Sequence, residues 1–129
     1  MRLISLAAIS LNQTPLDWQG NLSRIAQGIE EARGKGAGIL CFPELCLSGY
    51  GCEDAFKSHG VQEQAERCLL ELVPLTEGLV CALGLPVSVR GVLYDAVCLL
   101  CDAAVLGFAV KHHLAGDGIH YEPRWFAPW

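Results

Sequence analysis

The chain has 129 residues, of which 52% are hydrophobic and 18% charged, and fourteen acidic against nine basic side chains give a net charge of −5. This length suits one domain with a sizeable core, and the high hydrophobicity excludes a disordered chain. Because the sequence has no basic cluster that could follow a phosphate backbone, we expect no nucleic-acid partner.

The seven cysteines are an odd number, and several lie inside apolar runs such as residues 97–101. This usage is typical of reduced, buried thiols in a cytoplasmic protein rather than of a disulfide framework. Residues 3–11 have the apolar character of a short signal peptide, but no convincing small-residue cleavage site follows them. The longest apolar region, residues 92–110, is interrupted by Asp95 and Asp102, so we expect no membrane span and a cytoplasmic location.

The first elements in chain order predict a βαβ unit. Residues 2–11 have the apolar character of a buried strand, and Asp17 is a plausible N-cap for the helix that follows. That helix has one apolar stripe at spacings of three and four, made of Trp18, Leu22, Ile25, Ile29 and Ala32. The short apolar run 38–42 predicts a second strand, which Pro43 ends. A strand, a helix and a strand in this order favour parallel pairing through a right-handed crossover.

The rest of the chain predicts one more helix and three strands. A second apolar stripe, ending near Pro74, consists of Val61, Ala65, Cys68, Leu69, Leu72 and Val73. Residues 79–89, 91–102 and 104–114 then predict three consecutive strands. Both faces of these strands are apolar, so we expect the sheet to be covered on each side. The predicted fold class is α/β, with the order βαβαβββ.

Glu44 and Lys111 each follow a predicted buried strand. Glu44 comes directly after Pro43, at the carboxyl end of a strand, where open α/β sheets bind their ligands, and it could act as a general base. The alternative is a loop glutamate that caps a turn or pairs with a cation. Lys111 directly follows the apolar run 107–110. Burying an ammonium group there costs free energy unless a carboxylate pairs with it. Its alternative is a strand-end lysine whose stem reaches to water.

Two groups of possible metal ligands do not have the spacing of a metal site. Cys98 and Cys101 have C-x-x-C spacing, but residues three apart on a strand point to opposite faces and no second pair completes a zinc site. His112, His113 and His120 lack the spacing of a metalloprotease motif. Because neither group has the spacing of a metal site, we expect no metal in this chain. No glycine-rich phosphate loop is present, so we also expect no nucleotide cofactor.

Two segments resemble the carbon-nitrogen hydrolase (nitrilase) superfamily. They are residues 42–56, FPELCLSGYGCEDAF, and residues 111–129, KHHLAGDGIHYEPRWFAPW. Within the superfamily they are most similar to the glutaminase domains of bacterial glutamine-dependent NAD synthetases, and the similarity includes residues 11–21, LNQTPLDWQGN. The resemblance implies a four-layer αββα sandwich, of which residues 1–129 would be the N-terminal portion.

The resemblance also implies a site. Glu44 matches the general base of the family, and Lys111 matches the lysine that stabilises the oxyanion of the tetrahedral intermediate. Glu122 resembles a second glutamate that positions the lysine, and Tyr50 lies where similar domains have a substrate-pocket tyrosine. We therefore expect Glu44 and Lys111 to converge at one edge of the sheet.

The family's nucleophile is a cysteine well downstream of the lysine, and this sequence reaches Trp129 without one. Cys52, in the segment CED, precedes Lys111 instead of following it. Neither Cys46 nor Cys52 has a neighbouring cation or helix N-terminus that would lower its pKa, so we expect both to be structural. The expectation is a domain truncated before its nucleophile and inactive by itself.

The implied reaction is hydrolysis of glutamine, or of a related amide, to supply ammonia for the conversion of deamido-NAD to NAD. The glutaminase half-reaction needs no cofactor, whereas ATP and Mg²⁺ are expected only in a synthetase domain that these residues lack. We also expect the chain to associate through uncovered apolar faces, and the full-length enzyme to be a homo-oligomer. Two alternatives stay open: a non-catalytic remnant or interaction module of the same fold, and another amidase or nitrilase of the superfamily.

Overall fold

The computed structural model describes residues 3–129, so position 2 of the first predicted strand lies outside it. The elements follow the predicted βαβαβββ order, with short 3-10 helices (η) between them. In chain order they are β1 (Leu6–Ala8), α1 (Trp18–Gly34), β2 (Ile39–Cys41), η1 (Tyr50–Lys57), α2 (His59–Leu72), η2 (Val73–Thr76), β3 (Val80–Val89), β4 (Val92–Cys101), β5 (Ala104–Val110) and η3 (Glu122–Arg124). Both early strands are shorter than their apolar runs. No helix among residues 3–129 has the length and apolar character to cross a bilayer.

The five strands form one sheet in the order β1-β2-β3-β4-β5. β1, β2 and β3 pair in parallel, as the predicted βαβ unit requires, whereas β4 is antiparallel to both β3 and β5. Two-residue turns make these hairpins, with positive φ at Arg90 and Gly91 in one and at Asp102 and Ala103 in the other. β5 therefore runs in the same direction as β2, and the carboxyl ends of the two strands share one edge of the sheet.

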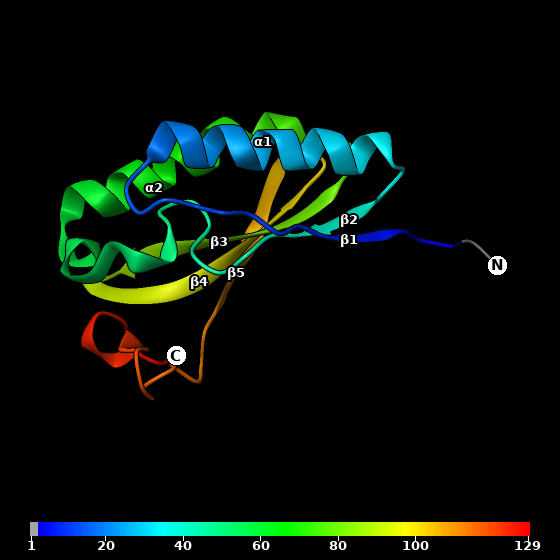
Figure 1. Cartoon of the computed structure of the whole chain (residues 1–129). Coiled ribbons are helices and arrows are strands. Elements are labelled where there is room, and N and C mark those ends of the chain that lie inside the picture. The colour runs from blue at the N-terminus through cyan, green and yellow to red at the C-terminus, as the bar shows by residue number, and fades with distance from the viewer. Residues whose placement is uncertain (1–2) are drawn as a thin grey trace.

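Both long helices cover the same face of the sheet (Figure 1). The Asp17 side chain accepts a hydrogen bond from the Gly20 amide at 3.1 Å and so caps α1, as its position in the sequence predicts. The apolar stripes of α1 and α2 pack on alternate strand residues to form the main core. Its buried members include Ile25, Ile29, Leu40, Cys68, Leu69, Leu72, Cys81, Leu83, Leu85, Cys98 and Leu100.

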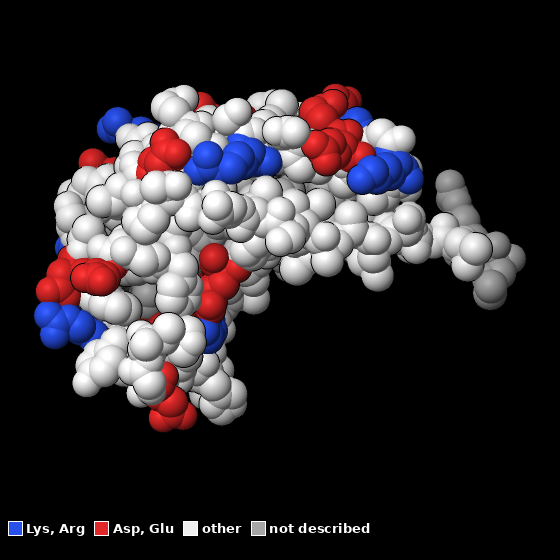
Figure 2. Space-filling view, viewed as in Figure 1, with Lys and Arg blue, Asp and Glu red and all other residues white. Residues whose placement is uncertain are grey.

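The other face of the sheet carries no α-helix in the described part of the chain, and the segment with η3 lies below only one end of the sheet (Figure 1), which differs from the covering predicted for both sides. Strand alternation places Leu6, Ile39, Cys41, Ala82, Val97, Leu99 and Ala109 on this face, which we call the open face. None of the seven is buried, and Leu6 is 72% exposed. Figure 2 shows few charged atoms beneath the sheet, while most of the charge lies over the helices and at one end.

The segment 111–129 crosses the end of the sheet and packs against η1. Its anchor is a second, small core of Leu45, Cys52, Phe56 and Phe126. Asp54 on η1 accepts hydrogen bonds from the Arg124 side chain at 2.7 and 2.8 Å and from the Trp125 indole at 2.9 Å. These contacts fix η3 beside the carboxyl edge of the sheet.

Candidate active site

Glu44 and Lys111 meet at the edge where β2 and β5 end. The Lys111 ammonium donates a hydrogen bond to Glu44 Oε1 at 2.5 Å. Glu44 is the third residue after β2, and Lys111 is the first residue after β5. Because both strands run in the same direction, two residues far apart in the sequence reach one place.

Gly84 on β3 allows the loop with Glu44 to lie against the sheet. A Cβ atom at Gly84 would come within 2.4 Å of the Leu45 nitrogen and 2.6 Å of the Pro43 oxygen. The next residue, Leu45, is fully buried and has a φ of 49°, a conformation that bulky residues rarely adopt. The backbone around Glu44 is therefore held by close packing on β3 and by the small core below it.

Glu122 lies on the other side of the Lys111 ammonium. It is only 1% exposed, and its Oε2 is 2.8 Å from Lys111 Nζ. The Tyr50 hydroxyl donates to Oε1 at 2.7 Å and the Ala115 amide to Oε2 at 2.7 Å. Burial raises the pKa of Glu122, but the donors Lys111, Tyr50 and Ala115 outweigh it, so that the pKa lies below its ordinary value. Glu122 is thus a carboxylate that faces the lysine from a fixed position.

Tyr50 reaches this cluster from η1. Its hydroxyl contacts Glu122 and lies 3.3 Å from His120 Nδ1. Burial, and then the hydrogen bond to the Glu122 carboxylate, raise the pKa of Tyr50 above its ordinary range. The phenol therefore stays protonated and donates to Glu122, which makes Tyr50 part of the arrangement around Lys111.

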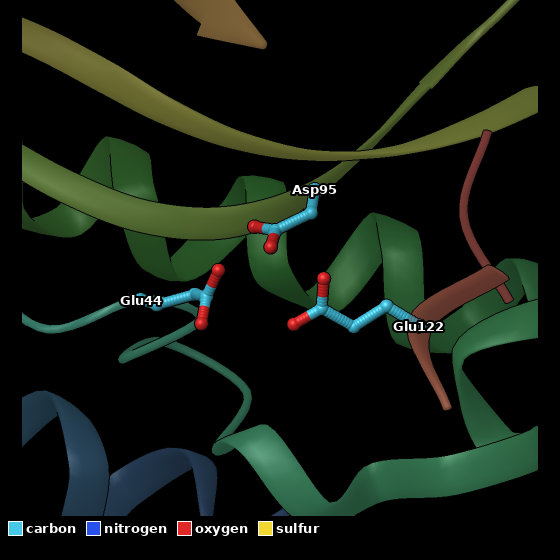
Figure 3. A group of neighbouring side chains, drawn as sticks. All are labelled: Glu44, Asp95 and Glu122. Carbon is cyan, nitrogen blue, oxygen red and sulfur yellow. The ribbon is translucent and has the colours of Figure 1, made fainter. Parts of the chain in front are cut away.

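Asp95 belongs to the same cluster and was not predicted as a site residue. It lies on β4, is 3% exposed, and its Oδ2 is 3.8 Å from Lys111 Nζ. Figure 3 shows Glu44, Asp95 and Glu122 pointing toward one another from a loop, a strand and η3. The signal was present in the sequence, because an acidic residue inside an apolar strand is costly to bury without a partner.

The three carboxylates are the only group of potential metal ligands found among residues 3–129, with ligand atoms within 4.8 Å of one another. Lys111 already supplies positive charge between them, since its ammonium contacts Glu44 and Glu122. A bound cation would have to displace that ammonium or lie against it. The arrangement therefore favours a lysine site over a metal site.

A hollow of about 460 Å³ opens beside the cluster, on the uncovered side of the sheet. Glu44, Asp95 and Lys111 form its polar wall, and its other walls are mainly apolar. This volume lies in the range of small-molecule sites. A second hollow of about 420 Å³ lies between α1 and residues 7–12, and none of the cluster residues lines it.

All seven cysteines are free thiols, and five of them are buried. Burial raises the pKa of Cys46 to about 12 and those of Cys81 and Cys98 to about 11, and it also raises that of Cys52. Such thiols are poor nucleophiles at neutral pH. Cys41 is exposed and lines the hollow, where its Sγ atom contacts the Phe42 carbonyl oxygen at 3.9 Å.

Comparisons with known proteins identify the family of this chain. The model of the carbon-nitrogen hydrolase family matches residues 5–127. A glutamine-dependent NAD(+) synthetase from Saccharomyces cerevisiae is 38% identical over 129 residues, which is 98% of this chain and 18% of the relative. This chain thus spans less than a fifth of the length of such curated relatives.

Two solved structures show the same fold. A glutamine-dependent NAD(+) synthetase from Cytophaga hutchinsonii superposes with a TM-score of 0.96 and 43% identity, over 98% of this chain and 22% of that one. An amidase from Nesterenkonia sp. superposes with a TM-score of 0.85 and 25% identity, over 98% of this chain and 48% of that one.

Proposed function

Because the chain belongs to the carbon-nitrogen hydrolase family, whose α/β fold it shares, we propose that its residues form the base and the cation of an amide-hydrolysing site, and that the amide is glutamine. The observation that carries this proposal is the contact between Lys111 and Glu44 beside an apolar hollow. A carboxylate and an ammonium held together there can serve proton transfer and oxyanion stabilisation in one reaction.

In the proposed reaction, Glu44 takes the proton of a cysteine thiol as its sulfur attacks the amide carbon. The carbonyl oxygen becomes an oxyanion, which the Lys111 ammonium stabilises. Collapse of this intermediate breaks the carbon-nitrogen bond, and the proton held by Glu44 leaves with ammonia. Water then attacks the thioester, with Glu44 again taking a proton, and glutamate is released with the thiol restored. Glu122 acts through Lys111, because it holds the ammonium on the side opposite Glu44.

We propose that the attacking thiol comes from polypeptide outside residues 1–129 that covers the open face. Five of the seven cysteines are buried, Cys101 does not line the hollow, and Cys41, the exposed thiol in the hollow, contacts a backbone carbonyl. Replacing Cys41 by alanine tests this assignment, since the activity should then survive. Loss of activity in Cys41→Ala with an intact fold would make Cys41 itself the nucleophile.

The ammonia is proposed to serve the ATP-dependent amidation of deamido-NAD, in which ATP and Mg²⁺ are held by a synthetase domain. The names of the yeast and Cytophaga relatives support this step.

The seven free cysteines support a reducing compartment such as the cytoplasm. Assembly of the complete protein into a homo-oligomer is part of the proposal, with the apolar open face as one surface that needs a partner.

The test is ammonia release by the natural polypeptide that carries these residues, with glutamine, asparagine, a nitrile and a simple acyl amide as substrates. We expect glutamine to be preferred, and Glu44→Gln and Lys111→Ala to lower kcat/KM by about a thousandfold or more. The matched controls are Glu66→Gln on the exposed side of α2 and Lys57→Ala, which lie outside the cluster. A rate near that of the wild type in Lys111→Ala would overturn the proposal.

A further inference from the structure

Asp95 has a carboxyl oxygen for which the described residues offer no hydrogen-bond donor. Its Oδ2 is buried and unpartnered among residues 3–129. The Lys111 ammonium is 3.8 Å away, beyond hydrogen-bonding distance, because it is drawn to Glu44 at 2.5 Å and to Glu122 at 2.8 Å. The backbone places Asp95 firmly, since its carbonyl accepts the Lys111 amide at 2.9 Å where β4 and β5 part.

The charges in this cluster do not balance if every carboxyl group is ionised. One ammonium would face three carboxylates, which come from the loop after β2 (Glu44), from β4 (Asp95) and from η3 (Glu122). Glu122 has three donors, and Glu44 has the lysine and is partly exposed. Asp95 is buried like Glu122 but has no donor, so its ionised form has the largest uncompensated desolvation cost.

We propose that Asp95 is a protonated carboxylic acid in the folded protein at neutral pH, and that it donates its proton to Glu44 as a positioning residue. A protonated carboxyl group is a donor, and Glu44 is the carboxylate that faces it across the hollow. The hydrogen bond holds Glu44 from one side while Lys111 holds it from the other. The orphaned oxygen and the excess of carboxylates are then explained by one proton.

The electrostatics of the site support this protonation state. Burial raises the pKa of Asp95 from 3.8 to about 8, with a further contribution from Glu44 and opposition from Lys111. Below that pH the cluster holds one ammonium and two carboxylates. Above it, Asp95 ionises and competes with Glu44 for the Lys111 ammonium, so Glu44 loses both a donor and part of its cation.

The direct test is spectroscopic and needs no activity. In the natural polypeptide labelled with carboxyl-¹³C aspartate, we expect one aspartic acid signal to be protonated at pH 7 and to titrate near pH 8. That signal should be absent from Asp95→Asn and present in Asp102→Asn, a matched change in the exposed turn at the other end of β4. If every aspartate of the wild type is ionised at pH 7, or if the protonated signal persists in Asp95→Asn, the inference is wrong.

The asparagine variant also tests the fold, because its amide imitates a neutral donor of the same shape. We expect Asp95→Asn to fold and to keep a donor for Glu44. Asp95→Leu has no donor, so we expect it to be less stable than Asp95→Asn. Failure of Asp95→Asn to fold would contradict the proposal, since it would show that the negative charge is required.

The role in positioning rests on the proposed amide hydrolysis and is read from the pH profile of ammonia release. We expect Asp95→Ala to lose at least about tenfold in kcat, and Asp95→Asn to recover most of that loss and to retain more activity than the wild type above pH 8. If ammonia release by Asp95→Asn falls above pH 8 as it does in the wild type, the positioning role is wrong. If the polypeptide releases no ammonia but the protonated signal is present, the proposed function fails and the protonation state of Asp95 stands.

Discussion

Lys111 Nζ lies 2.5 Å from Glu44 Oε1, although the two residues are separated by 67 positions in the sequence. The contact exists because two strands with the same direction end at one edge of the sheet, and because Gly84 leaves room for the loop that carries Glu44. Lys111 also contacts a buried glutamate, so the lysine links an exposed carboxylate to a fixed one.

Removing the ammonium should destabilise the protein as well as inactivate it. In Lys111→Met, Glu122 keeps its Tyr50 and Ala115 donors but loses the cation at 2.8 Å, and three carboxyl groups then face one another. We expect the free energy of unfolding at pH 7 to fall by about 3 kcal/mol, measured by denaturant titration. Lys57→Met should change it by less than about 0.5 kcal/mol, and an equal loss in both variants would refute this explanation.

Tyr50→Phe deletes one of the donors that keep Glu122 ionised. The ring stays, so the loss reports the hydroxyl, which should contribute about 2 kcal/mol to stability because its acceptor is charged and buried. The pKa of Glu122 should also rise, which a carboxyl-¹³C titration measures. Tyr121→Phe, in an exposed neighbour, is the control and should leave both quantities as they are. No rise for Glu122 in Tyr50→Phe would show that the hydroxyl is unimportant.

Gly84→Ala should displace the loop that carries Glu44. The added methyl group would lie 2.4 Å from the Leu45 nitrogen, and backbone atoms cannot move aside as the end of a flexible side chain does. We expect a loss of about 3 kcal/mol or more in unfolding free energy, and a drop in ammonia release, because the Glu44 loop must lift from β3. Gly34→Ala, in open space at the end of α1, should instead be neutral or stabilising by up to about 1 kcal/mol. A neutral Gly84→Ala would mean that the loop does not depend on this close approach.

Asp95 should make the protein less stable as the pH rises. The folded pKa of Asp95 is raised, so between pH 3.8 and about pH 8 the folded state holds a proton that the unfolded state releases. The unfolding free energy therefore decreases with pH across this window, and the decrease is complete above pH 8. Asp95→Asn should remove this slope in thermal unfolding from pH 5 to 8, whereas Asp102→Asn should keep it.

Glu122 acts in the opposite sense, which gives the acid side of the same experiment. Its folded pKa is lowered, so its stabilisation is present above its ordinary pKa of 4.5 and is lost as the pH falls through the folded value. Acid unfolding should begin below pH 4.5 in the wild type. A thermal unfolding midpoint that stays constant as the pH falls below 4.5 would contradict this role of Glu122.

The order of the elements along the chain, both helices and the neighbourhood of Glu44 and Lys111 could be predicted from the sequence because they leave local signals. The apolar stripes of α1 and α2 recur at helical spacing, and each turn between strands contains residues that suit a positive φ or a break. Glu44 and Lys111 follow within three residues of the ends of β2 and β5, so the shared direction of these strands brings the two side chains together.

The other partners of Lys111 could not be derived in the same way: Glu122 and its neighbour Tyr50 are expected only from the family resemblance, and Asp95 is not expected. The contacts of Asp95 depend on which face of β4 meets the cluster, and the Tyr50–Glu122 bond depends on how the segment 111–129 folds back on η1. Neither leaves a periodic pattern, because each joins elements that are distant in the chain. The shortness of β1 has a similar cause, since a strand at the edge of the sheet ends where its single neighbour ends.

The central claim is that Glu44 and Lys111 act as one unit in amide hydrolysis, and a double-mutant cycle on glutamine-dependent ammonia release tests it most directly. If they form one unit, Glu44→Gln combined with Lys111→Ala should cost no more in kcat/KM than the more damaging single change. Losses that multiply, or a double variant with a rate near that of the wild type, would contradict the claim.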